Sequence, residues 1–289
     1  MPSEFAISSP PTSLIRRHPV LVYFVLTFGL SWSGAFLLVA PRLLRGEPIP
    51  KFTGLMMFPI MLLGPLIAGL TMTAFMGGRA GLREPGARLL RIRVPARWFL
   101  VLMIPPALIL AVLTLLRWLV SSVYTPNLFL IGLSFGLIAG FIEEIGWTGF
   151  ALPWMMRTRS TFGAALLLGL LWSLWHAPVI DYLGTATPHG RYWLAYFLAF
   201  AAAMTAIRVL IAWLYANTGS VLLAQLLHTA STGALVVFSP AGVSAGEEAL
   251  WYFAYAGALW MLVLGVRGVF GVNLKKVPRT EAVSTAMIR

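Results

Sequence analysis

The strongest constraint on this chain is a series of long apolar stretches separated by short polar connections. A helix needs roughly 20 apolar residues to cross a bilayer, and free backbone N–H and C=O groups find no partner in lipid, so membrane-crossing stretches of this kind are helical. Only 10% of the 289 residues are charged, against about 25% in a typical soluble domain. We therefore predict an all-α membrane protein, a polytopic bundle of about eight transmembrane helices. The predicted spans are about 19–40, 53–76, 98–116, 128–156, 161–180, 192–216, 220–238 and 249–271.

The predicted organisation is one membrane domain with two short tails. We expect a cytoplasmic N-terminal tail at 1–18, an eight-helix transmembrane domain at 19–272 and a cytoplasmic C-terminal tail at 273–289. The sequence contains no internal repeat of the kind that many transporters carry. It also contains no cysteine, which excludes disulfides, a thiol nucleophile and thiolate metal sites.

The distribution of Lys and Arg predicts the orientation. Connections on the side of the two termini carry 14 basic residues and the opposite connections carry 5, and basic residues concentrate on the cytoplasmic side. We therefore expect a cell-membrane protein with both termini in the cytoplasm. The basic segment 79–97 is predicted to lie at the membrane surface, against lipid headgroups. The net charge of +12 is then explained by membrane anchoring, and no nucleic-acid partner is implied.

A few ionisable residues lie inside the predicted spans, where each costs at least about 2.5–3.5 kcal/mol at the bilayer centre. They are Glu143, Glu144, His176, Arg208, His228 and Arg267. Arg267 lies near the end of the last span, where its side chain can reach the interface. At 1.5 Å per residue, Glu143 and His176 lie about 22 and 27 Å from the connection near residue 158, so they can share a level. We expect all except Arg267 to form one buried cluster.

Small residues predict how the fourth span packs. Glycines recur every four residues, at Gly132, Gly136 and Gly140, a pattern that lets a second helix approach closely. Glu144 and Thr148 continue this row and should face the packed helix. Glu143, turned about 100° away, shares its side with Trp147. This pattern predicts a structural role for Glu144 and a reactive role for Glu143.

Three motifs give this sequence a family resemblance. They read EEIGWT at 143–148, WSLWH at 172–176 and HTAST at 228–232. Together they resemble the EExxxR, (F/W)xxxH and HxxxN/D motifs of the CPBP family, the intramembrane glutamic proteases related to CAAX prenyl proteases and to bacteriocin-processing proteins. The resemblance covers a core at about 127–235.

The resemblance implies a peptide-bond hydrolase in which a water molecule is the nucleophile. Glu143 would be the general base, His176 would orient the water, and His228 with Thr232 would stabilise the oxyanion. Trp147 and Trp172 would line the pocket. The implied partners are a peptide or protein substrate, with or without a lipid modification, and membrane lipids. The family's cavity faces the cytosol, and the resemblance implies no cofactor.

Two positions depart from the family motifs. Thr148 stands where the family has arginine, and Thr232 stands where it has asparagine. A threonine hydroxyl can still donate to an oxyanion, but Thr148 cannot neutralise Glu144. Arg208, on the sixth span, is costly if left alone. We therefore expect Arg208 to supply across helices the positive charge that Glu144 needs.

The residues leave other chemistries open. Ser173 and Ser231 each lie within a turn of a histidine, but neither has the G-x-S-x-G context of a serine hydrolase. The H-E-x-x-H signature of zinc proteases is absent. A metal could still be held by Glu143, His176 and His228.

Non-catalytic functions also remain open. The polar residues could form an ion-pair network, with core histidines, in a membrane scaffold or bacteriocin-immunity protein. They could also form the proton relay of a transporter, which the lack of a repeat disfavours. Asp181 and His189 fall in a connection between spans, where we expect them to be solvated.

Overall fold

The structure is a computed structural model that describes residues 14–275, with the backbone alone for residues 79–85. Most of both predicted tails, at 1–13 and 276–289, lies outside the described residues. The described part contains helices and no strand, and six of its helical stretches are long and apolar enough to cross a membrane. Two shorter apolar helices complete the bundle. The predicted all-α membrane fold is confirmed.

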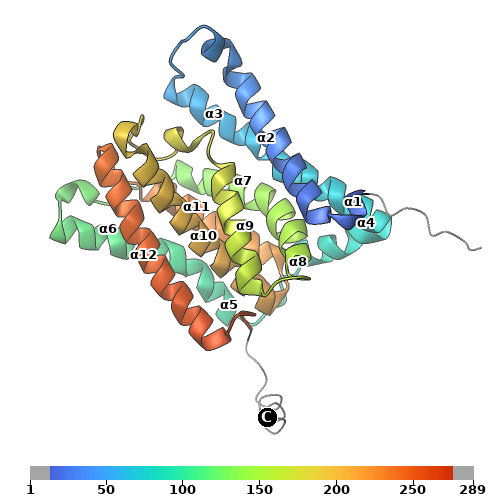
Figure 1. Cartoon of the computed structure of the whole chain (residues 1–289). Helices are drawn as coiled ribbons and strands as arrows, with labels where there is room; N and C mark the ends of the chain where they lie inside the picture. The colour runs from blue at the N-terminus through green and yellow to red at the C-terminus, as the bar shows by residue number, and fades with distance from the viewer. Residues whose placement is uncertain (1–13, 276–289) are drawn as a thin grey trace, which may run out of the picture.

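The helices alternate in direction along the chain (Figure 1). The first half comprises α1 (Leu14–Arg17), α2 (Pro19–Leu44), α3 (Lys51–Met61), α4 (Leu63–Leu89), α5 (Arg97–Leu100) and α6 (Ile104–Leu119). The second half comprises α7 (Ile131–Gly146), a π-helical turn (Trp147–Ala151), α8 (Leu152–Met155), α9 (Thr161–Trp175), α10 (Trp193–Thr218), α11 (Val221–Val237) and α12 (Ala245–Phe270).

A proline divides the second crossing into α3 and α4. Pro65 has no N–H to donate to the carbonyl group of Met61, four residues earlier. The hydroxyl group of Ser31 on α2 donates to that carbonyl oxygen instead, at 2.7 Å. A side chain at Gly64 would collide with Ser31, so the glycine allows α2 to reach the break. Further along, Gly78 has φ 56° and bends α4 towards the basic segment.

The close packing of α7 against α11 follows from the glycine row. A Cβ atom at Gly136 would lie 2.5 Å from the carbonyl oxygen of Thr229, and one at Gly140 would lie 2.6 Å from that of Gln225. The two backbones therefore touch along this row, and Gln225 Nε2 also donates to the carbonyl oxygen of Phe141 at 2.9 Å. Next to this pair, α10 is the most buried crossing, packed against α9 and α12.

The fifth span is shorter than predicted. We expected it to reach residue 180, but α9 ends at Trp175. Pro178 disfavours helical backbone at the residue before it, and the chain turns irregularly from His176 to Tyr192. His176 therefore lies at the end of a helix and not within one.

The connections form two groups at opposite ends of the bundle. We call one of them the mouth end, because a cavity described below opens there. At this end, the Lys51 amine donates to the carbonyl oxygens of Gly184 and Thr185, at 3.0 and 2.8 Å. The backbone N–H of Phe129 reaches Val237 O at the same end, at 2.9 Å. In Figure 1 the connection from α2 to α3 and the one from α11 to α12 lie towards the top and left.

The other group holds the described chain ends. Phe162 N donates to Val272 O at 3.0 Å, which joins the start of α9 to the end of α12. Asn217 Nδ2 donates to Leu274 O, and Ser220 Oγ donates to Arg91 O. In Figure 1, α1, α5 and the end of α12 lie towards the bottom and right. We call this the terminal end of the bundle.

Candidate functional site

Glu143 is buried on α7 and accepts hydrogen bonds through one of its two oxygens. Oε2 accepts from the indole nitrogen of Trp147 at 2.9 Å and from that of Trp172 at 2.7 Å. Oε1 is buried and has no hydrogen-bond partner among the described residues. The carboxylate is thus oriented by two fixed donors, and its second oxygen is available to accept a proton.

Trp172 on α9 connects the polar residues of the site. Besides its bond to Glu143, its ring lies 5.6 Å from the His176 ring and 5.0 Å from the His228 ring, edge to face. The guanidinium carbon of Arg208 lies 4.3 Å from its ring centroid, within the range of a cation–π contact. From the sequence, Trp172 was predicted only to line the pocket. Its position one turn before His176 was the feature that could have predicted its contacts with the other polar residues of the site.

Glu144 is turned about 100° from Glu143 on α7 and has partners from three helical segments. Its Oε2 accepts from Arg208 Nη1 on α10 at 2.8 Å, and also from the hydroxyl group of Thr148. Its Oε1 lies 2.8 Å from Nδ1 of His228 on α11. All four residues are buried, so this carboxylate has both a countercharge and hydrogen bonds.

The ring orientation of His176 follows from one contact. Nδ1 lies 2.8 Å from the carbonyl oxygen of Trp172. A carbonyl oxygen can only accept, so Nδ1 carries the proton, and in neutral imidazole Nε2 is then an acceptor. The ring is held between Phe58, stacked at 5.9 Å, and Phe200, at 5.2 Å.

The α9 residue that meets Glu143 is Trp172. His176 follows it by one helical turn, and its Nδ1 lies next to the carbonyl oxygen of Trp172. That Glu143 and His176 share a level stays a prediction.

The structure does not bring every predicted site residue into this network. Thr232 lies half-buried one turn after His228 and makes no hydrogen bond among the described residues. Ser173 donates to the carbonyl oxygen of Gly169 at 2.7 Å and contacts that of Ala201 at 3.2 Å, so its hydroxyl group is not directed at a histidine. Within the described residues, no three His, Asp or Glu side chains are placed to hold a metal ion.

A π-helical turn, which no sequence pattern predicted, follows the two glutamates. It runs from Trp147 to Ala151 and is buried throughout. The wider turn keeps Trp147 and Thr148 within reach of the glutamates four residues before them. Single π-helical turns occur often at functional sites.

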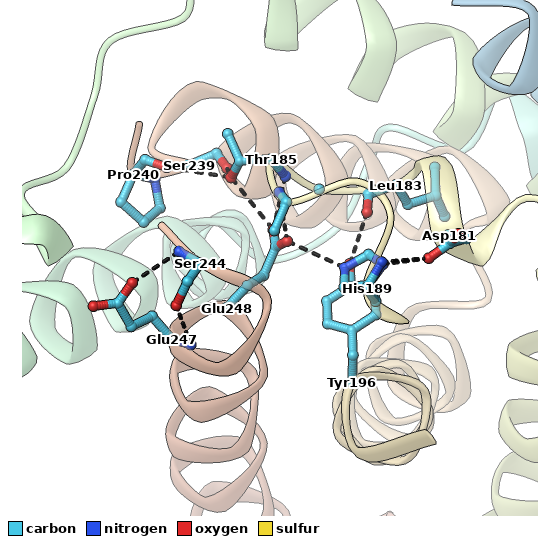
Figure 2. A network of polar contacts seen from close by, with 12 residues as sticks. Asp181, Leu183, Thr185, His189, Tyr196, Ser239, Pro240, Ser244, Glu247 and Glu248 are labelled. Carbon is cyan, nitrogen blue, oxygen red and sulfur yellow. Dashed lines mark hydrogen bonds and ion pairs between the residues drawn. The ribbon is translucent and has the colours of Figure 1, made fainter. Parts of the chain in front are cut away.

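A second polar cluster holds the connection between α9 and α10, which we name the 181–189 loop (Figure 2). His189 lies between Asp181, 2.9 Å from Nδ1, and Glu248 on α12, 3.2 Å from Nε2. The Glu248 carboxylate also accepts from the backbone N–H groups of Thr185 and Ala186. The imidazole is 1% exposed and stacks on Tyr196 at 3.9 Å. The expectation that His189 is solvated was wrong, because the loop folds back onto α12.

Burial of His189 disfavours its charged form. The hydrogen bonds to Glu248 and Asp181 outweigh that effect and raise the pKa of His189 above its usual value. These contacts close the loop onto the start of α12. The same loop forms part of the wall of a cavity.

The cavity has a volume of about 370 Å³ and opens at the mouth end of the bundle. Its wall is mostly apolar and comes from α3, α7, the 181–189 loop, α10, α11 and α12. Its lining includes Phe58 and Phe200, whose rings pack against His176. The mouth lies at the end of the bundle opposite the described chain ends.

Part of the sequence is similar to known proteins. Residues 125–234 match the family described as type II CAAX prenyl endopeptidase Rce1-like. A curated relative, CAAX prenyl protease 2 of Methanococcus maripaludis, is 32% identical over 113 residues.

The alignment covers 37% of this chain and 39% of the relative, so the similarity extends over less than half of either protein. The matched region contains the two glutamates of α7, the WSLWH motif of α9 and His228 of α11. These are the segments that the fold brings together in one buried cluster. Over residues 125–234, the chain is similar to the Rce1-like CAAX prenyl endopeptidase family.

Proposed function

We propose that this protein is an intramembrane glutamic endopeptidase of the CAAX type, which hydrolyses a peptide bond of a membrane-associated or lipidated peptide. The main support for the proposal is the burial and hydrogen bonding of the Glu143 carboxylate. It is a buried carboxylate with one oxygen held by two indoles and the other without a described partner. A group held in this way is suited to accept a proton from a water molecule.

Two residues act on the water in this proposal. Glu143 Oε1 accepts one proton as the water oxygen attacks the carbonyl carbon of the scissile bond. His176, protonated at Nδ1, offers Nε2 to a second water proton and so orients the nucleophile. Both side chains are fixed by contacts with Trp172, which favours attack because orientation replaces a search through conformations.

His228 is the proposed donor to the oxyanion. Nδ1 of His228 lies 2.8 Å from Glu144 Oε1, which leaves Nε2 as the ring nitrogen that would contact the oxyanion. Thr232, one turn further along α11, would donate from the same helix. Fixed donors in a dry site stabilise such charge strongly.

Collapse of the tetrahedral intermediate completes the hydrolysis. The C–N bond breaks, and the proton taken up by Glu143 passes to the leaving amine. The products are a carboxylic acid and an amine, so the water is fully accounted for and Glu143 returns to its ionised state. The sequence implies no cofactor for this cycle.

The proposed location is the cell membrane, with both termini in the cytoplasm, because the terminal end of the bundle carries most of the basic residues. Membrane lipids would contact the apolar outer faces of the helices and the basic segment 79–97. The printed name of the relative indicates prenylated substrates for that protein. For this chain, a lipid-modified peptide is one substrate class within the proposal.

The test is cleavage of a peptide library by protein reconstituted in nanodiscs. Wild type should cleave, and Glu143→Gln, which keeps size and polarity but cannot take up the proton, should lose at least about a hundredfold in rate. Glu47→Gln is the matched control, because Glu47 is half exposed and pairs with Arg45 far from the site. Cleavage that survives in Glu143→Gln would reject the mechanism.

Absence of cleavage by wild type would favour a different class of function. Glu143, Glu144, His176, Arg208 and His228 are all buried, and the rings of Phe58 and Phe200 lie between the cavity they line and His176. Together with Thr148 and Thr232, this closed state is what a non-catalytic scaffold or bacteriocin-immunity protein would show. Such a protein should bind a partner equally well with Glu143→Gln, which a pull-down of both forms would measure.

A further inference from the structure

The 181–189 loop is held against the bundle mainly by polar contacts. His189 is the one buried residue of this loop, and the other eight are half-buried or exposed. A segment with few buried apolar contacts opens at a low cost in free energy. Leu183, Gly184 and Thr185 of this loop nevertheless form part of the cavity wall. This part of the wall can therefore move without disrupting the apolar core.

Glu248 on α12 is the residue that holds the middle of the loop. Its buried carboxylate accepts from the backbone N–H groups of Thr185 at 2.8 Å and Ala186 at 2.9 Å. Gly184 has φ 90°, and a Cβ atom there would collide with Glu248 Oε1, so this glycine lets the carboxylate lie directly against the loop backbone. A buried carboxylate needs a countercharge in addition to hydrogen bonds.

The position of His189 suits it to supply that charge. Nδ1 lies 2.9 Å from Asp181 Oδ1, and Nε2 lies 3.2 Å from Glu248 Oε2 (Figure 2). Ionised carboxylates only accept hydrogen bonds, so both contacts are hydrogen bonds only when both ring nitrogens carry a proton. The closed loop therefore fits the imidazolium form of His189.

The other titratable groups around this ring do not replace the imidazolium. Tyr196 on α10 stacks on the ring at 3.9 Å, and Tyr252 on α12 packs against Tyr196, but phenols are neutral below about pH 10. Lys51 on α3 donates to two backbone carbonyl oxygens of the loop. His189 is thus the cation that contacts both carboxylates.

We infer that the 181–189 loop is a gate in the cavity wall, held closed by protonated His189 between Asp181 and Glu248 and released when that proton is lost. A neutral imidazole donates from one nitrogen only, so its other nitrogen would direct a lone pair at a carboxylate. Glu248 would then be a buried anion without a countercharge, and opening of the loop would let water solvate it. A role of the gate in regulating cleavage rests on the proposed function, but the movement of the loop does not.

The absence of cysteine lets a single introduced thiol report the position of the loop. Leu235 on α11 lines the same cavity and is 8% exposed, so Leu235→Cys should react slowly with a maleimide while the loop is closed. The rate in detergent is divided by that of Glu47→Cys, which is exposed between α2 and α3. This ratio removes the common effect of pH on thiolate reactivity.

The ratio should rise as the pH increases. The pKa of His189 is raised by its bonds to Glu248 and Asp181, so the gate should be closed near pH 6 and open at about pH 9. We expect the ratio to increase at least about tenfold over this range, because the lost hydrogen bond is one to a charged group. An unchanged ratio would overturn the inference.

Two variants at position 189 separate charge from packing. His189→Arg keeps a cation at every pH, and a guanidinium can still stack on Tyr196 and donate to the carboxylates, so the ratio should stay low at both pH values. His189→Gln carries no charge, so the ratio should be high at both. Equal ratios in the two variants would overturn the inference.

A milder variant covers the case in which either of these proteins does not fold, as judged by thermal unfolding. Asp181 has a side chain that is 31% exposed, so Asp181→Asn should be tolerated. It removes one of the two charges that favour the imidazolium, and the rise in the labelling ratio should move to lower pH. A rise at the same pH as in wild type would contradict the gate.

A cleavage assay separates the regulatory role from the proposed function. If the gate controls access to the site, kcat/KM of wild type divided by that of His189→Arg should rise with pH in parallel with the labelling ratio. Identical pH profiles of cleavage in the two proteins would refute the regulatory role and leave the protease standing. No cleavage by either protein would count against the proposed function, while the labelling result would still decide whether the loop is a gate.

Discussion

At the scale of the residue, Glu144 shows how a departure from a family motif is accommodated. The motif places a cation one turn after the glutamate, but here that position holds Thr148. The structure places Arg208 Nη1 on α10 2.8 Å from the carboxylate, while Thr148 donates its hydroxyl group to the same oxygen. The countercharge arrives from another helix, and the position one turn away retains a neutral donor.

This arrangement predicts strong coupling between three positions. Arg208→Ala leaves a buried carboxylate without its countercharge, which should lower the free energy of unfolding by about 3–5 kcal/mol. Adding Thr148→Arg should restore part of that loss, because the new guanidinium can reach Glu144 from the π-helical turn that follows α7. Thermal unfolding in detergent of the single and double variants measures the coupling. Strictly additive effects would show that Arg208 and Glu144 do not depend on each other.

Trp172 provides a second prediction at this scale. Trp172→Phe keeps an aromatic ring against His176, His228 and Arg208 but removes the N–H that donates to Glu143. A hydrogen bond to a charged group is worth about 1.5–3 kcal/mol, so cleavage should slow by about ten- to a hundredfold with a similar KM. Trp260→Phe is the matched control, because Trp260 donates to the carbonyl oxygen of Ala202. An equal loss in both variants would indicate a general effect of losing an indole.

At the scale of the element, the glycine row positions the site through close packing of α7 on α11. Gly136→Ala would place a Cβ atom 2.5 Å from Thr229 O and 2.6 Å from Gly233 N, and backbone atoms cannot move aside as a flexible side chain can. We expect a loss of about 1–3 kcal/mol in the free energy of unfolding. Gly265→Ala on α12, where no atom lies within 4 Å of the new Cβ, should be neutral or slightly stabilising. Equal effects in thermal unfolding would contradict the packing argument.

The 181–189 loop gives a prediction of pH dependence. The pKa of His189 is raised in the folded state, so its contribution to stability is complete below the unfolded value of about 6.5. That contribution is lost as the pH rises through the raised folded value. The groups that face the imidazole are Asp181, Glu248 and Tyr196.

The measurement compares thermal unfolding of wild type and His189→Gln over this pH range. The difference between the two should be largest near pH 6 and should shrink at alkaline pH. His18→Gln is the control, because His18 is exposed at the start of α2. A difference that does not change with pH would show that the imidazole acts by packing alone.

At the scale of the whole molecule, the cavity is assembled from parts of the chain that are far apart in sequence. Its wall comes from α3, α7, the 181–189 loop, α10, α11 and α12. It includes Phe58 and Phe200, whose rings pack against His176. The cavity and its contact with the site therefore depend on how the helices pack, and not on any one segment.

Much of the fold could be predicted because it depends on local properties. The length of the apolar stretches predicted helical crossings, and the spacing of Gly132, Gly136 and Gly140 predicted a closely packed partner. The division of the chain into tails and one domain at 19–272 stays a prediction, and so do the catalytic roles. The end of α9 was placed five residues too far, because an apolar run does not show where a helix stops.

The sequence by itself determined the membrane class, the helical content and the short set of ionisable residues that had to find partners, since burying a charge in lipid is costly wherever it lies. Only the tertiary structure decided which partners they found. It placed Trp172 between Glu143 and the two histidines, enclosed His189 between Asp181 and Glu248, and opened the cavity at the end opposite the chain termini. These outcomes depend on the rotation and depth of helices packed from distant parts of the chain, which no local pattern encodes.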